Sequence, residues 1–189
     1  LEETVGDVFV EGVAGGIDTV IVMVDGLTIG ADVENIRLGG TAHVLIGGDD
    51  DNSLTGSNGD DDLDGGDGDD LLVAGAGNDD LRSDDGDDTM AGGDGDDTYF
   101  ISLASGTKHI QDSAGNNTLS LQGGFNLNMI RFGLGSLKIS SGLPGDEIHL
   151  DGVDYDNLAG TSPISSIQFS DGQTMSVADA IAAVGIDLP

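Results

Sequence analysis

Aspartate and glycine are concentrated in one part of this 189-residue chain, and their types and spacing are those of a metal-binding segment. Between Gly47 and Phe100 the sequence holds nineteen Asp and thirteen Gly, but no Glu and one Arg. A solvated acidic surface would use Asp and Glu alike, whereas Asp among Gly indicates short carboxylates on a tightly turning backbone. Carboxylate and carbonyl oxygens are the hard ligands that Ca²⁺ prefers. Zinc and copper are disfavoured because the chain has no Cys and this segment has no His.

The same segment repeats every nine residues. Cut at this interval, it reads GGDDDNSLT, GSNGDDDLD, GGDGDDLLV, AGAGNDDLR, SDDGDDTMA and GGDGDDTYF. The eighth position is apolar in all six units, and the interval extends upstream through Leu45 and Ile36. The fourth position is Gly in the last five units, and the sixth position holds Asn52, Asp61, Asp70, Asp79, Asp88 and Asp97. Three columns in register over six units are not a chance pattern.

Each unit divides into a six-residue Gly/Asp turn and a three-residue strand. Two units restore the direction of the chain, so 18 residues form one coil, and stacked coils place strands about 4.8 Å apart. The eighth residues then form two inward apolar ladders, and the sixth residues align in two columns. Aligned carboxylates repel, by about 1 kcal/mol per pair in bulk water and by more near a surface. The pattern therefore predicts a cation between turns, and Ca²⁺ is favoured over Mg²⁺, which demands near-octahedral geometry.

These units resemble the nonapeptide repeats of RTX (repeats-in-toxin, haemolysin-type) proteins, whose G-G-x-G-x-D-x-U-x pattern binds calcium. GGDGDDLLV and GGDGDDTYF match every defined position, whereas GGDDDNSLT has Asp50 for Gly and Asn52 for Asp. The resemblance implies an all-β fold, a parallel β-roll (a β-helix or solenoid) with calcium between its turns. It further implies several calcium ions, about four to six.

The resemblance also implies which residues hold the metal. Side-chain pairs across successive coils would be Asp61 with Asp79, Asp79 with Asp97 and Asp70 with Asp88, with Asn52 and Asp70 a poorer fourth pair. Asp112 would cap the last turn. Turn residues expected to complete the sites through their backbone carbonyls are Gly56, Gly59, Gly65, Gly66, Gly68, Gly75, Gly77, Gly86, Gly93 and Gly95.

Composition divides the chain into three parts. Residues 1–46 are expected to form degenerate lead-in coils of the roll, 47–100 the six repeats, and 101–189 a non-repeat capping segment. In the last part, strand patterns occur at 129–132, 136–140 and 147–150. A hairpin is predicted around Asp171-Gly172, and Ser176 is predicted to cap a short terminal helix.

Charge and motifs exclude several classes of function. Thirty-six acidic against five basic residues give a net charge of −31, which excludes nucleic-acid binding through phosphate neutralisation. No stretch approaches the roughly 18 apolar residues of a transmembrane segment. The motifs of zinc proteases, serine hydrolases and Walker-type nucleotide sites are absent, so this chain is not predicted to be an enzyme, although a catalytic domain could lie upstream in a parent protein. The three His are isolated in sequence and expected at the surface or in strands. Arg82 could neutralise a neighbouring Asp or simply face solvent at the ninth position, and the second interpretation is favoured.

The favoured hypothesis is a calcium-binding RTX module of a secreted bacterial-type protein. It would leave the cell through a type I secretion machinery and fold on binding Ca²⁺ outside, acting as a folding switch and a stabilising domain. Two alternatives stay open: an ancillary module of an extracellular protease, lipase or polysaccharide epimerase, and an adhesin or toxin tail that binds a host surface glycan or receptor. Sequence upstream of Leu1 would test the first, and a glycan array with the calcium-loaded module would test the second.

Overall fold

The computed structural model describes residues 9–11, 19–28, 33–102, 106–112, 114–133, 137–140, 146–151 and 162–187. Within these ranges the chain is mostly β-strand, with one 3₁₀ helix and one α-helix. The strands up to the end of the repeats are β1 (Phe9–Glu11), β2 (Thr19–Val22), β3 (Leu27–Thr28), β4 (Asn35–Leu38), β5 (Val44–Gly48), β6 (Ser53–Thr55), β7 (Asp62–Gly66), β8 (Leu71–Ala76), β9 (Asp80–Ser83), β10 (Asp88–Asp94) and β11 (Thr98–Ile101). The later elements are β12 (Gly106–Ile110), β13 (Thr118–Leu121), η1 (Leu127–Met129), β14 (Arg131–Gly133), β15 (Leu137–Ser140), β16 (Asp146–Leu150), β17 (Ser166–Gln168), β18 (Thr174–Ser176), α2 (Val177–Val184) and β19 (Ile186–Asp187).

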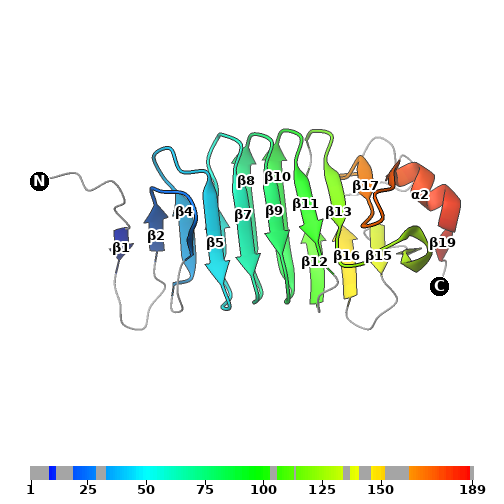
Figure 1. The fold of residues 1–189 in the computed structure, drawn as a ribbon, viewed down its shortest axis with the longest axis horizontal. Coiled ribbons are helices and arrows are strands. Elements are labelled where there is room, and N and C mark those ends of the chain that lie inside the picture. Colours follow the sequence, from blue (N-terminus) through cyan, green and yellow to red (C-terminus); the bar gives the residue numbers. More distant parts are fainter. Residues whose placement is uncertain are drawn as a thin grey trace, which may run out of the picture.

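Alternate strands of the repeats enter two different sheets, as expected if the turn of each nine-residue unit reverses the chain (Figure 1). One sheet has the order β1-β2-β4-β6-β8-β10-β12-β16-β15-β14-β19, and the other has the order β18-β17-β13-β11-β9-β7-β5-β3. From β4 to β12 and from β3 to β13 every neighbouring pair is parallel. The predicted parallel β-roll is therefore confirmed, and Figure 1 shows its strands standing side by side along the long axis of the molecule.

Two ladders of large side chains fill the space between the sheets. Leu54, Leu72 and Met90 follow one another in the first sheet, each 18 residues after the last, because their strands pair in register. Leu63 and Leu81 do the same in the second sheet. All five side chains are fully buried, and a buried side chain of this size stabilises the fold by about 1.5–3 kcal/mol.

The ladders continue past the last repeat, although the nine-residue period does not. Met90 pairs with Ile110 and Tyr99 with Leu119, an offset of 20 residues in each case. Leu119 then pairs with Ile167. Longer loops between these strands hide the period in the sequence, while the buried positions keep the same stacking.

The predicted C-terminal elements are present. β17 and β18 form an antiparallel hairpin around Asp171 and Gly172, whose φ is 86°. Ser176 caps α2, because its Oγ accepts a hydrogen bond from the Asp179 N–H at 3.1 Å. The patterns at 136–140 and 147–150 become β15 and β16, whereas 129–132 is split between η1 and β14. Among the described residues, no helix has the length and apolar content needed to cross a bilayer.

Candidate metal centre

The turns of the repeats stack so closely that their fourth position requires glycine. Gly77 and Gly95 occupy this position in successive coils, with φ of 135° and 133°. A Cβ on Gly95 would lie 1.8 Å from the carbonyl oxygen of Gly77, and one on Gly77 would lie 2.5 Å from that of Gly59. Both the left-handed backbone and the close approach exclude a side chain. Stacking therefore holds the turn carbonyls in register from coil to coil.

The sixth-position carboxylates lie inside the roll, and each binds the preceding coil. Oδ1 of Asp70 accepts a hydrogen bond from the Asn52 N–H at 2.8 Å, and Oδ1 of Asp79 accepts one from the Asp61 N–H at 2.8 Å. Oδ1 of Asp97 accepts one from the Asp79 N–H at 2.9 Å. The five sixth-position Asp residues are at most 3% exposed. In Asp70, Asp79 and Asp97 one carboxylate oxygen thus fixes the register of the coils, and these contacts do not use the other oxygen.

In three of these residues the second oxygen has no hydrogen-bond partner in the part of the chain that the structure describes. Oδ2 of Asp70, Asp79 and Asp97 is buried without a hydrogen bond to any described residue, and so is Oδ1 of Asn52. An unpaired buried charge is costly. A Cβ on Gly65 would lie 2.3 Å from Asp70 Oδ2, so the leading glycine of the unit leaves room beside this oxygen. A desolvated carboxylate oxygen with room beside it fits a hard cation such as Ca²⁺.

Burial makes these carboxylates difficult to ionise without such a cation. The pKa of Asp70 is raised from 3.8 to about 7, chiefly by burial and in part by the charges of Asp88 and Asp51, against the lowering effects of the Asn52 N–H and the Lys108 charge. Burial also raises the pKa of Asp79 to about 6. Within each column the carboxylates also repel one another, as Asp88 does Asp70 and Asp61 does Asp79. This is the repulsion expected from the sequence.

A second ladder of side chains runs in the opposite direction along the roll and was missed at the level of sequence. Oδ1 of Asp60 accepts a hydrogen bond from the Asn78 N–H of the following coil, and Oδ1 of Asn78 accepts one from the Asp96 N–H, both at 2.8 Å. The fifth position is Asp or Asn in every unit, which was the available signal. The residues of this ladder are Asp51, Asp60, Asp69, Asn78, Asp87 and Asp96.

The sixth-position residues form two columns, one on each side of the roll. The Asp79 column consists of Asp61, Asp79 and Asp97, preceded by His43 and followed by Asn117 in register. The Asp70 column consists of Asn52, Asp70 and Asp88, followed by Lys108.

At the start of the Asp79 column, both oxygens of Asp61 have partners. Oδ2 accepts hydrogen bonds from the N–H and the hydroxyl of Ser57 at 2.6 and 2.9 Å. Oδ1 lies 3.3 Å from Nδ1 of His43. His43 lies at the surface, as predicted, with its side chain 52% exposed, but it is not isolated, because coil stacking brings it to the carboxylate 18 residues later.

At the end of the Asp70 column, Asp88 also differs from its neighbours. Its Oδ1 accepts the Asp70 N–H at 2.8 Å, as the column requires. Its Oδ2 accepts hydrogen bonds from Nζ of Lys108 at 2.6 Å and from the Ser83 hydroxyl. Neither contact was expected from the sequence, since Lys108 lies outside the repeats.

Asp112 lies next to the last sixth-position residue, Asp97. Its negative charge adds to the effect of burial in raising the pKa of Asp97 to about 6. Asp112 Oδ2 accepts a hydrogen bond from the Tyr99 hydroxyl at 2.6 Å, and this hydroxyl accepts one from the Gly92 N–H. Tyr99 is therefore both a core side chain and a support for Asp112 beside Asp97.

The remaining polar residues are less isolated than expected. Arg82 pairs with Asp62 and Asp80 and lies over the ring of Phe100, with 4.4 Å to the ring centre. Of the two interpretations of Arg82, neutralisation of neighbouring Asp residues is the one that the structure shows, because strand alternation places these groups around a side chain that is 35% exposed. His109 and His149 lie in strands, as predicted, but they are register partners with ring centres 4.9 Å apart.

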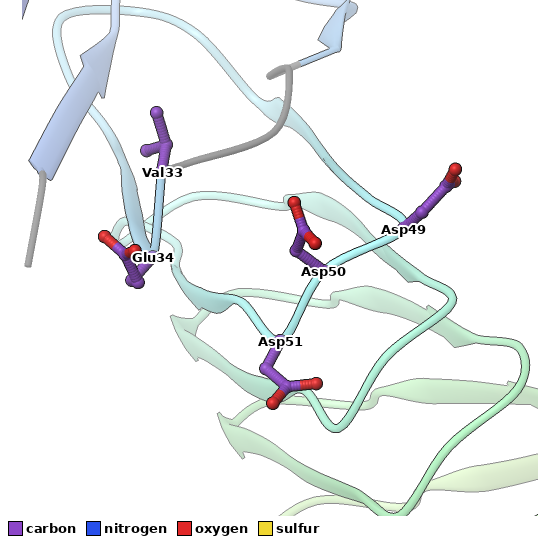
Figure 2. Close-up of a pocket in the computed structure, with 5 residues that line it drawn as sticks. All are labelled: Val33, Glu34, Asp49, Asp50 and Asp51. Carbon is purple, nitrogen blue, oxygen red and sulfur yellow. The ribbon is translucent and has the colours of Figure 1, made fainter. Parts of the chain in front are cut away.

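Carboxylates do not converge on one point as they would in a site made of side chains alone. Among the described residues, no three His, Asp or Glu groups are placed to hold one ion. Figure 2 shows this for the acidic hollow lined by Glu34, Asp49, Asp50 and Asp51, whose carboxylates point in different directions. A cation in these turns would instead take one buried carboxylate together with backbone carbonyls. The glycines predicted to supply or flank them all lie in the stacked turns or at the strand ends beside them: Gly56, Gly59, Gly65, Gly66, Gly68, Gly75, Gly77, Gly86, Gly93 and Gly95.

Comparison with known proteins identifies the repeats. The family model of the RTX calcium-binding nonapeptide repeat (four copies) matches residues 39–72 and 64–99. No curated protein matches the chain.

Proposed function

Because the repeat region of this chain is an RTX β-roll, a structural module that binds Ca²⁺, we propose that it acts as a calcium-dependent folding switch. The buried, unpaired Oδ2 atoms of Asp70, Asp79 and Asp97 carry this proposal. They are stable in the ionised form only when a cation replaces the water that they lose on folding. Calcium would therefore be a condition for forming the roll and not a later addition to it.

The proposed ligands follow from the repeat. Lys108 Nζ contacts the carbonyl oxygens of Asp84 and Gly86 and the carboxylate of Asp88, which are the second, fourth and sixth positions of one unit. In the other units, the carbonyl oxygens of the second and fourth residues and the side-chain oxygen of the sixth residue would bind Ca²⁺. The next turn of the same column would contribute to binding the ion. This gives five sites, with sixth-position ligands Asn52, Asp61, Asp70, Asp79 and Asp97. Asp112 would assist Asp97.

Calcium concentration would decide which state the chain adopts. With little calcium, the net charge of −31 and the aligned carboxylates favour an expanded chain. RTX repeats are typical of secreted proteins, and an expanded chain suits passage through a type I secretion machinery. Outside the cell calcium is plentiful, and sites of this extracellular kind bind with dissociation constants on the order of 10⁻⁴–10⁻³ M. The chain would then fold after export.

Circular dichroism tests the switch directly. The far-ultraviolet spectrum should be that of an unfolded chain in excess chelator and should gain a strong β signal in a few millimolar CaCl₂. The change should reverse when chelator is added back. A β spectrum of equal strength in chelator would contradict the proposal.

A matched pair of substitutions tests the ligand assignment. Asp79→Asn keeps an oxygen that can accept the Asp61 N–H but removes the buried charge, so we expect the calcium midpoint of folding to rise roughly tenfold to a hundredfold. Asp67→Asn removes the same charge from an exposed third position. It should change the calcium midpoint of folding by at most about threefold. Equal midpoints for the two variants would reject Asp79 as a ligand.

A further inference from the structure

Lys108 occupies the place in the Asp70 column where the repeat would put an aspartate. Its strand β12 pairs with β10 in register, with Lys108 opposite Asp88. Asn52, Asp70 and Asp88 stand at this position in the three preceding coils. The side chain of Lys108 is 2% exposed, so the ammonium group lies inside the roll.

The ammonium group is surrounded by oxygens of a single repeat turn. Nζ donates to the Asp88 carboxylate at 2.6 Å and to the Gly86 carbonyl at 2.7 Å, and it also contacts the carbonyl of Asp84. A lysine ammonium has three N–H donors, and these three contacts satisfy all of them. Lys108 therefore occupies a site made of two turn carbonyls and one carboxylate.

The other units offer the same oxygens without a lysine. In the unit 65–73 the equivalent atoms are the carbonyls of Gly66 and Gly68 and the carboxylate of Asp70, whose Oδ2 is unpaired. The two units differ in the coil that stacks on each of them. The coil after the unit 65–73 brings Asp88 over Asp70, whereas the coil after the unit 83–91 brings Lys108 over Asp88.

We propose that the ammonium of Lys108 takes the place of a calcium ion in the turn of residues 83–88. Resting on the proposed function, this assigns to the roll one cation site that the chain fills itself. A divalent ion cannot share the site with the ammonium, because the two charges repel and use the same oxygens. The tethered cation is part of the chain, so wherever the roll is folded the C-terminal end of this column is neutralised without a calcium ion in this turn.

Calcium stoichiometry measured by equilibrium dialysis tests this assignment. Lys108→Asn places in the Asp70 column the residue type that follows Asp97 in the other column, namely Asn117. We expect this variant to bind one more calcium ion per chain than the wild type. Lys138→Asn is the matched control, because Lys138 pairs with Glu147 away from the turns, and its stoichiometry should equal that of the wild type. A Lys108→Asn variant that folds in calcium and binds no additional ion overturns the proposal.

The wild-type protein supplies a second test that does not depend on the variant folding. In a crystal grown with saturating calcium, anomalous scattering should locate ions in other turns and none in the turn of residues 83–88. An ion in that turn overturns the proposal even if Lys108→Asn does not fold. If the wild type binds no calcium at all, the proposed function fails together with this inference. If it binds calcium but the variant gains no ion, only the assignment of Lys108 fails.

Discussion

In the middle turns of the roll, the fifth and sixth side chains of a unit point in opposite directions along the roll. In the unit 74–82, Oδ1 of Asn78 accepts the N–H of Asp96 from the next coil, whereas Oδ1 of Asp79 accepts the N–H of Asp61 from the previous coil. A short Asx side chain can reach the adjacent backbone in this way, whereas Glu would overreach it by one methylene. This explains why the repeats contain Asp and Asn without Glu.

The same burial gives the calcium-free roll a pH dependence that can be predicted in sign. The pKa of Asp79 is raised to about 6, chiefly by burial and in part by the charges of Asp61, Asp60 and Asp80, against the lowering effect of the Asp61 N–H. A carboxyl group whose folded pKa exceeds its unfolded value destabilises the fold above the folded pKa. At about 1.4 kcal/mol per pKa unit, Asp79 alone costs the calcium-free roll about 3 kcal/mol at neutral pH.

Acid should therefore partly replace calcium. In chelator, the free energy of unfolding should increase as the pH falls from about 7 to about 4. Over this range Asp70, Asp79 and Asp97 bind protons in the folded state but remain mostly ionised in the unfolded chain, because their folded pKa values are raised. Circular dichroism against pH measures this, and Asp79→Asn should give a flatter profile because one of the titrating groups is gone. A calcium-free chain that becomes less ordered over this range would contradict the prediction.

Among the elements, the strands and the turns contribute differently to the roll. The strands are short and bury one large side chain per unit, as Leu63, Leu72 and Leu81 show. Such a thin core gives limited stability. The turns add backbone contacts between coils, so their stacking controls whether the strands can pair at all.

Gly95→Ala should separate the cost of coil stacking from that of backbone conformation. Gly95 and Gly172 both have positive φ, but a Cβ on Gly95 would meet the Gly77 carbonyl, whereas one on Gly172 would meet no atom within 4 Å. Gly172→Ala should cost about 1–2 kcal/mol for the left-handed backbone. Gly95→Ala should cost about 1–3 kcal/mol more because of the collision. Urea unfolding in saturating calcium measures both, and equal losses would show that the turns are not closely stacked.

For the whole molecule, the elongated stack in Figure 1 concentrates charge of one sign along the turns. Monovalent salt screens exposed charges over a Debye length of about 8 Å at 0.15 M. It does not enter the desolvated positions beside Asp70 and Asp79, which are 3% and 0% exposed. Screening and binding are thus distinct ways to reduce repulsion, and only binding replaces the lost hydration of these carboxylates.

Small-angle X-ray scattering should distinguish screening by salt from binding of calcium. In chelator the radius of gyration should approach about 46 Å, the value for an unfolded chain of this length. Millimolar CaCl₂ should reduce it sharply, whereas NaCl at equal ionic strength should leave the chain expanded. Equal compaction by both salts would mean that general screening, and not a bound ion, drives folding.

Much of this protein could be predicted from its sequence, because the repeat is periodic and the structure repeats with it. Identical offsets of 18 residues place Leu54 beneath Leu72 and Asp61 beneath Asp79, so the apolar ladders and the two carboxylate columns follow from spacing alone. The hairpin at Asp171-Gly172 and the Ser176 cap follow from local turn and capping chemistry.

Tertiary structure alone decided what stands at the ends of the columns. After Phe100 the offset between stacked strands changes from 18 to 20 residues and then to more, so counting along the sequence no longer identifies the residue over Asp88. The buried ladder sets that register in space, and it brings Lys108 to Asp88 and Asp112 to Asp97. A periodic sequence specifies its own stacking, but where the period ends, side-chain packing between coils determines which charge meets the final aspartate.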